Sequence, residues 1–80
     1  MWEIKYSQEV RNYIYDSYPY TAMVWDVIKS LKNSSDGLPP TGAQLLEPEL
    51  YLWEVANHLV IYRRLTHERI LKFIVVKPME

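Results

Sequence analysis

The stretch LYLWEVANHLVIYRR, residues 50–64, predicts two antiparallel strands joined by a very short turn. Successive side chains of a strand point to opposite faces, so the position of the turn determines which side chains share a face. With Asn57 and His58 as a two-residue turn, one face pairs Val55 with Val60, Trp53 with Tyr62 and Tyr51 with Arg64. We expect this face to belong to the core.

The opposite face of the hairpin is also rich in apolar side chains. On the same turn it pairs Ala56 with Leu59, Glu54 with Ile61, Leu52 with Arg63 and Leu50 with Leu65. A four-residue loop would keep every side chain on its face, whereas a three-residue loop with a bulge would turn one strand over. The assignment of faces therefore depends on the turn.

The sequence before the hairpin predicts one strand and two helices. Residues 2–6 alternate apolar and charged side chains, and Ser7 is suited to cap a helix that ends before Pro19. A second helix begins at Pro19 or Thr21. Its apolar stripe consists of Met23, Val24, Val27, Ile28 and Leu31.

The remaining segments are a connection and a final strand. GLPPTGAQLLEPE, residues 37–49, holds three prolines and both glycines, so we expect little regular structure there. RILKFIVVKP, residues 69–78, is apolar at both parities from Phe73 to Val76, which predicts a strand covered on both faces. The order β-α-α-β-β-β predicts a single α+β domain over residues 1–80, with a helical hairpin on one face of a small, mainly antiparallel sheet.

Composition excludes several classes of site. The 80 residues contain no cysteine and no Cys/His cluster, so we expect neither disulfides, nor a metal site, nor a cofactor. The two histidines, His58 and His67, lie in turns without a third ligand nearby in sequence. No apolar run has the length of a membrane span and no signal peptide is recognisable, which predicts a cytoplasmic protein without a membrane partner.

Charge is unevenly distributed along the chain. Residues 1–60 hold four basic and eight acidic side chains, and residues 61–80 hold five basic and two acidic ones. Phosphate neutralisation dominates affinity for nucleic acids, so a strongly basic domain would indicate RNA or DNA. This local excess makes only a weak case for RNA, and ordinary solvated charges are the alternative.

Several segments together resemble the RelE/ParE toxin superfamily of bacterial type II toxin-antitoxin modules, which includes plasmid stabilisation proteins. They are the element order, the connection that ends in GAQLLEPELYLWEV, the strand HLVIYR and the terminal strand ILKFIVV. The resemblance implies a small toxin that is neutralised by an antitoxin protein. It also implies one of two activities, cleavage of mRNA on the ribosome or inhibition of a target such as DNA gyrase, and a shared fold does not choose between them.

The ribonuclease branch of this family uses basic side chains on the open face of the sheet. The matching positions here are not basic. Leu59 occupies the position of the family's arginine before Val-Ile-Tyr, and Leu52 and Glu54 occupy the basic positions of the preceding strand. The family's C-terminal basic residues fall around Met79 and Glu80. Loss of one preorganised donor typically costs about 10² to 10³ in rate. The resemblance, with these departures, favours protein binding over RNA cleavage.

Substitute catalytic residues remain available. Arg63, Arg64 and Lys77 are the nearest basic side chains, and we expect only Arg63 to share the face of Leu59 and Ile61. A ribosome-dependent endoribonuclease that uses these three residues is therefore an alternative, and we leave open whether the protein is an enzyme.

Two surfaces are candidates for partner binding. The first is the open sheet face, formed by Leu50, Leu52, Leu59, Ile61 and Leu65 with Glu54 and Arg63 at its rim, where we expect an antitoxin. The alternative is that residues 37–49 fold over this face and cover it. The second is YIYDSYPY, residues 13–20, whose Tyr15, Tyr18 and Tyr20 predict target recognition by the helical hairpin or, alternatively, capping of the core.

The sequence thus leaves three functions open. The first is a toxin that acts mainly by protein binding, the second is a ribosome-dependent ribonuclease, and the third is a non-toxic degenerate family member that serves as an interaction module. Partners under these hypotheses are an antitoxin, the ribosome, gyrase or a second copy of the chain.

Overall fold

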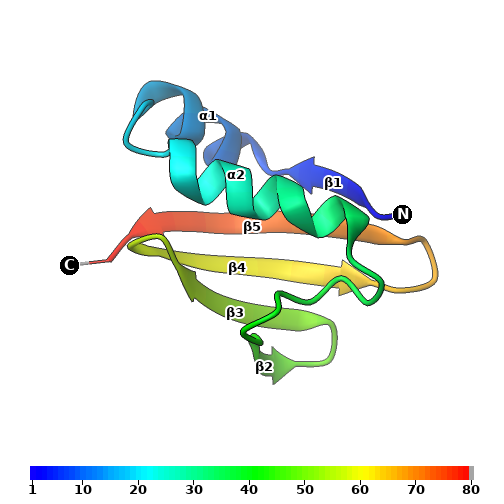
Figure 1. Cartoon of the computed structure of the whole chain (residues 1–80). Coiled ribbons are helices and arrows are strands. Elements are labelled where there is room, and N and C mark those ends of the chain that lie inside the picture. Colours follow the sequence, from blue (N-terminus) through cyan, green and yellow to red (C-terminus); the bar gives the residue numbers. More distant parts are fainter. Residues whose placement is uncertain (80) are drawn as a thin grey trace.

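A five-stranded mixed sheet carries two helices on one face (Figure 1). The computed structural model describes residues 1–79. Its elements are β1 (Glu3–Tyr6), α1 (Gln8–Asp16), α2 (Ala22–Ser30), a 3-10 turn η1 (Leu31–Asn33), β2 (Gln44–Glu47), β3 (Leu50–Val55), β4 (His58–Leu65) and β5 (Ile70–Pro78). The predicted α+β class, with both helices on one face of a mainly antiparallel sheet, is confirmed.

The sheet has the strand order β1-β5-β4-β3-β2. The first strand pairs with the last in parallel, and the other three pairs are antiparallel. The core lies between the sheet and the helices. It consists of Trp2, Val10, Ile14, Val24, Ile28, Leu31, Trp53, Val60, Tyr62, Leu71, Phe73 and Val76.

Both helices begin close to where the sequence places them. The Ser7 hydroxyl accepts a hydrogen bond from the Val10 amide at 3.2 Å, which is the predicted cap of α1. Thr21 precedes α2, and its buried hydroxyl donates to the Ile14 carbonyl at 2.7 Å, so it joins the two helices. The expectation for Met23 was wrong, since its side chain is 69% exposed and the buried stripe of α2 runs through its neighbour Val24.

The connection over residues 37–49 contains a strand that its composition hides. Gln44–Glu47 forms β2, an edge strand paired antiparallel with β3. The three prolines of the connection, Pro39, Pro40 and Pro48, lie outside β2, so none of them interrupts the hydrogen-bonded ladder. The element order is therefore β-α-α-β-β-β-β, which corrects the predicted order by one strand.

The turn between β3 and β4 is shifted from its predicted place. Ala56 and Asn57 form it, with φ of 53° and 60°, as a two-residue hairpin turn of type I′ requires. Trp53 therefore pairs with Val60 and Tyr51 with Tyr62, two residues away from the predicted partners. The shift is an even number of residues, so both faces keep their predicted side chains.

The double-sided apolar run in β5 has a different cause from the predicted one. A bulge interrupts the pairing of β4 with β5, since Ile61 pairs with Val75 while the next residue, Tyr62, pairs with Phe73. Ile74 is the extra residue. Inward side chains thus fall at Phe73 and Val76, and the prediction that this strand is covered on both faces was wrong, because the helices cover one face alone.

Candidate functional site

The open face of the sheet, opposite the helices, presents side chains in cross-strand rows. The strand register places Glu54, Leu59 and Lys77 in the first row. It places Gln44, Leu52, Ile61 and Val75 in the second row, and Leu50, Arg63, Lys72 and Lys5 in the third. An apolar row therefore lies beside a basic one.

The predicted open-face residues come together as expected. Leu50, Leu52, Glu54, Leu59, Ile61 and Arg63 alternate with the buried Trp53, Val60 and Tyr62 and so point away from the helices. The leucines and Ile61 remain partly exposed. Leu65 pairs with Ile70 at the far end of the same face.

The connection before β2 passes over the other side of the sheet. The Gly37 carbonyl accepts a hydrogen bond from the buried Tyr62 hydroxyl at 3.1 Å, and the Trp2 ring lies against Gly37. The strand Gln44–Glu47 extends the edge of the sheet. This arrangement disfavours the alternative in which residues 37–49 fold over the open face.

The three substitute catalytic residues do not converge. Arg63 and Lys77 share the open face, which corrects the expectation that only Arg63 does. Lys77 pairs with Leu59, however, four residues from Arg63 along β4, a separation of about 13 Å. Arg64 lies on the helix side, where its guanidinium donates to the Asp36 carbonyl and lies over the rings of Trp2 and Tyr51. These contacts make Arg64 a structural residue.

Sequence reasoning missed two members of the basic row. Lys72 in β5 pairs with Arg63 in the neighbouring strand β4 and with Lys5 in the neighbouring strand β1. Like charges directly opposite each other are unfavourable, and within residues 1–79 the ion pair of this row is Lys5 with Glu3 at 4.0 Å. The antiparallel pairing of β4 with β5 brings Lys72 beside Arg63, and the parallel pairing of the two ends of the chain adds Lys5, a contact that no local pattern in the sequence encodes.

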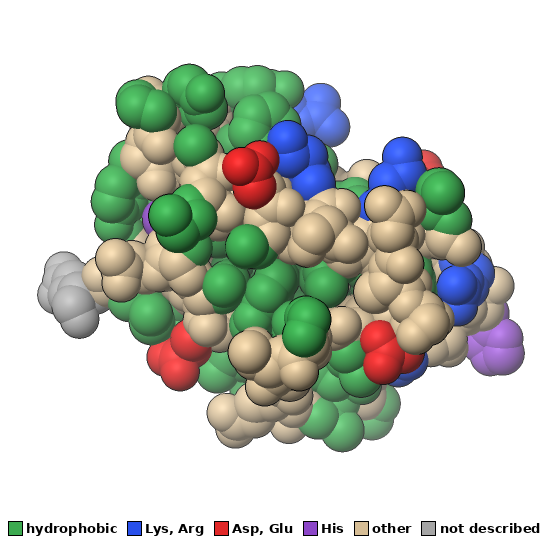
Figure 2. Space-filling view, viewed as in Figure 1, with side chains coloured by type: hydrophobic (Ala, Val, Ile, Leu, Met, Phe, Trp, Pro, Cys, Tyr) green, Lys and Arg blue, Asp and Glu red, His purple; other side chains and the backbone are tan. Residues whose placement is uncertain are grey.

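The other predicted surface lies at the joined ends of the helices. Tyr15, Tyr18 and Tyr20 are 63%, 60% and 56% exposed. Figure 2 shows hydrophobic side chains gathered over this end of the molecule. These tyrosines are available to a partner, although Tyr15 also contacts Trp25 edge-on and Tyr20 lies against His58.

His58 is a buried structural residue. Its side chain is 1% exposed, with Nδ1 2.8 Å from the Ala56 carbonyl and Nε2 2.8 Å from the Tyr13 hydroxyl. The carbonyl can only accept, so Nδ1 donates to it, and Nε2 shares a hydrogen bond with the Tyr13 hydroxyl. Burial raises the pKa of Tyr13, with Tyr20 as a smaller cause, so this hydroxyl keeps its proton at neutral pH. The pair attaches α1 to the β3–β4 turn and leaves His58 without access to a substrate.

The positions compared with the family's C-terminal basic residues give little further chemistry. Met79 is partly exposed, and Glu80 lies outside the described residues. Within residues 1–79 no three His, Asp or Glu side chains are grouped as metal ligands would be. No helix in the same range has the length and apolar character needed to cross a membrane.

The open face thus combines a partly exposed apolar row with a basic row, and neither is a compact catalytic cluster. Such a surface can bind an amphipathic polypeptide through both its apolar and its acidic side chains. Comparisons of the chain with protein-family models, with curated proteins and with solved structures find no match.

Proposed function

We propose that this protein is the toxin-like component of a bacterial type II toxin-antitoxin module, with a RelE/ParE-like fold, and that it acts mainly by protein binding. The observation that supports this most is the apolar row Leu52, Ile61 and Val75 on the open sheet face. The resemblance places basic side chains of the ribonuclease branch at Leu52, Glu54 and Leu59 on this face, and none of these residues is basic, so the face favours binding over cleavage.

The chemistry of this face defines the partner that fits it. Three adjacent aliphatic side chains favour an apolar ridge on the partner. Each is already half-buried, so completing its burial contributes less than the roughly 1.5–3 kcal/mol of a fully exposed side chain. The neighbouring row of Arg63, Lys72 and Lys5 favours carboxylates beside that ridge. An acidic amphipathic segment of an antitoxin has both features.

The tyrosine surface has a separate role in this proposal. Tyr15, Tyr18 and Tyr20 offer wide rings with polar tips, a residue type enriched at the centres of interfaces. They lie on the helical hairpin, away from the open face. We assign them to the cellular target, such as gyrase, so that antitoxin and target use different surfaces.

Growth of bacteria that express the chain tests the proposal. Expression without an antitoxin is expected to slow growth, and replacing Tyr15, Tyr18 and Tyr20 with Ala is expected to restore it. Circular dichroism of the purified variant checks that it still folds. A wild-type chain that is folded, abundant and harmless would contradict toxicity and leave the non-toxic interaction module.

A second candidate function rests on the basic row. Arg63, Lys72 and Lys5 stand side by side across three strands, as contacts to RNA phosphates would. A ribosome-dependent ribonuclease would leave cleaved transcripts on translating ribosomes, and these would disappear on changing Arg63 and Lys72 to Ala. Intact transcripts in arrested cells would exclude this candidate.

A further inference from the structure

A cleft lies where β1, α1 and α2 meet, on the helix side of the sheet. It encloses about 300 Å³ and is lined by Tyr6, Arg11, Ile14, Tyr15 and Trp25. This volume is at the lower end of the range for small-molecule pockets. Neither the proposed antitoxin surface nor the core accounts for it.

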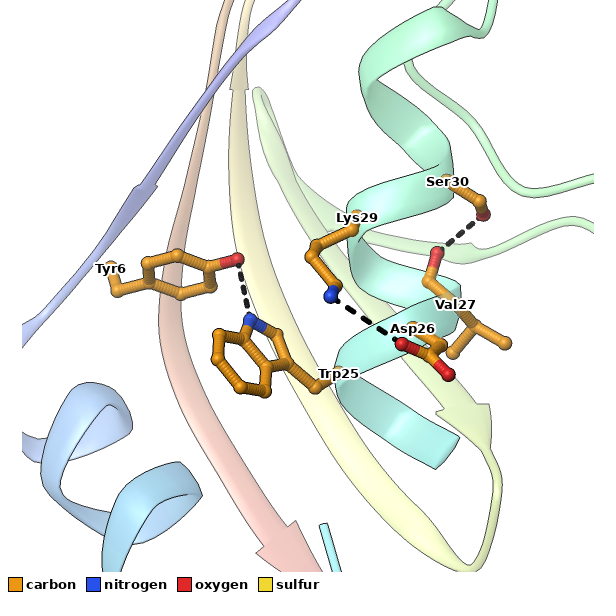
Figure 3. Close-up of polar contacts among 6 residues, drawn as sticks. All are labelled: Tyr6, Trp25, Asp26, Val27, Lys29 and Ser30. Carbon is orange, nitrogen blue, oxygen red and sulfur yellow. Dashed lines mark hydrogen bonds and ion pairs between the residues drawn. The ribbon is translucent and has the colours of Figure 1, made fainter. Parts of the chain in front are cut away.

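The aromatic walls of the cleft are held in place. The Trp25 indole N–H donates to the Tyr6 hydroxyl at 3.2 Å, and Figure 3 shows the two side chains pointing toward each other from α2 and β1. Tyr15 contacts Trp25 edge-on, with ring centroids 5.7 Å apart and an interplanar angle of 78°. The Lys29 ammonium lies 4.6 Å from the centroid of the Trp25 ring. Preorganised aromatic side chains of this kind favour another flat ring.

Two donors at the cleft remain available to a ligand. The Tyr6 hydroxyl accepts from Trp25, and its own proton has no acceptor within residues 1–79. Burial raises the pKa of Tyr6, with Tyr15 adding a smaller effect, so this hydroxyl stays protonated at neutral pH. The Arg11 guanidinium makes no ion pair with residues 1–79, whereas Lys29 is paired with Asp26 at 3.4 Å (Figure 3).

We propose that this cleft binds a small planar aromatic molecule that carries a carboxylate or phosphate group. The ring lies against Trp25 and Tyr15, and the anionic group accepts hydrogen bonds from Arg11 and the Tyr6 hydroxyl. The site goes beyond the proposed function: it shares Tyr15 with the proposed target surface but uses none of the open-face or basic-row residues.

Titration of the full-length protein with phenyl phosphate, followed by two-dimensional amide NMR, tests this site. The Trp25 indole N–H signal and amides around Arg11 are expected to shift. Benzyl alcohol has the ring but no anion to pair with Arg11, and inorganic phosphate has the anion but no ring to lie against Trp25, so each should bind about tenfold or more weakly.

Matched variants separate the two parts of the site. Arg11→Gln removes the charge from an exposed helical position and is expected to weaken phenyl phosphate about tenfold without changing benzyl alcohol. Lys72→Gln, the same loss of charge on the open face, should leave both affinities unchanged. Absence of shifts at Trp25 at millimolar ligand would overturn the proposal, and so would shifts confined to the Arg63–Lys72 row or equal binding of phenyl phosphate by Arg11→Gln.

Discussion

Tyr62 connects the core to the chain that crosses the helix side of the sheet. Its ring stacks between Tyr51 and Phe73, with centroid distances of 5.7 Å and 4.9 Å. Its hydroxyl donates to the Gly37 carbonyl. Tyr62 thus acts as a packing and anchoring residue, as its parity in the sequence predicts.

Alkaline pH should reveal this burial. Burial raises the pKa of Tyr62 well above its usual value of 10.0, with Tyr51 as the second cause. Above about pH 10 the unfolded chain releases the tyrosine proton while the folded chain retains it, so the free energy of unfolding falls as pH rises. Urea denaturation at increasing pH measures this fall.

Tyr62→Phe supplies the control for that measurement. The variant should lose about 1 kcal/mol at neutral pH, because the Gly37 carbonyl loses its donor, and should show a shallower fall above about pH 10. An equal slope in the variant and the wild type would mean that other tyrosines, such as Tyr6, cause the fall.

Alanine substitutions at Gly37 and Gly42 distinguish the cost of backbone strain from the cost of side-chain crowding. Both have left-handed backbones, with φ of 73° at Gly37 and 87° at Gly42. A Cβ at Gly37 would lie 2.9 Å from two carbons of the Trp2 ring, whereas one at Gly42 would meet nothing within 4 Å. Gly42→Ala should therefore destabilise by roughly 1–2 kcal/mol from strain alone. Gly37→Ala should cost about 1–3 kcal/mol more, and equal midpoints of thermal unfolding would refute this difference.

The β3–β4 turn shows what a local pattern can and cannot specify. Alternation assigns the core and open faces of the hairpin correctly, because an even shift in pairing preserves parity. It does not specify the register, which depends on Ala56 adopting a positive φ that this residue type rarely adopts. The candidate open face could therefore be predicted from sequence, but its exact cross-strand pairs could not.

The turn also predicts a stabilising substitution. Asn57 has a φ of 60° at the second turn position, where glycine carries no steric cost. Glycine removes this steric cost but has more freedom in the unfolded chain, so Asn57→Gly should stabilise the protein by about 0.5 kcal/mol or less. Asn12→Gly, the same change within α1, should destabilise by a similar amount. Chemical denaturation of both variants checks the opposite signs, and a loss of stability at both sites would contradict the assigned turn.

Several features depend on how strands pair, and no single segment of the sequence predicts them. The bulge at Ile74 depends on how β4 and β5 pair, with the Ser7 hydroxyl lying 3.4 Å from the Ile74 carbonyl. The strand β2 depends on the edge that β3 offers. The basic row requires β1 beside β5, a pairing that joins the two ends of the sequence, whereas the aromatic cleft requires β1, α1 and α2 to meet.

At the scale of the molecule, the two helices cover one face of the sheet and leave the other face open (Figure 1). One sheet face is sealed by the core, and the other presents an apolar row beside a basic one. In our proposal the open face binds an acidic antitoxin segment and the tyrosines of the helical hairpin recognise the target. This separation allows the two interfaces to be disrupted independently.

Complex formation with an antitoxin tests the central claim most directly. The proposal predicts a short reading frame for an acidic or DNA-binding protein beside the gene, and co-expression should yield a stable complex on size-exclusion chromatography. Ile61→Glu on the open face should abolish the complex while the domain stays folded. Met23→Glu, an exposed apolar-to-acid change on α2, should preserve it. A complex that survives Ile61→Glu, or a wild-type chain that forms none, would contradict the account.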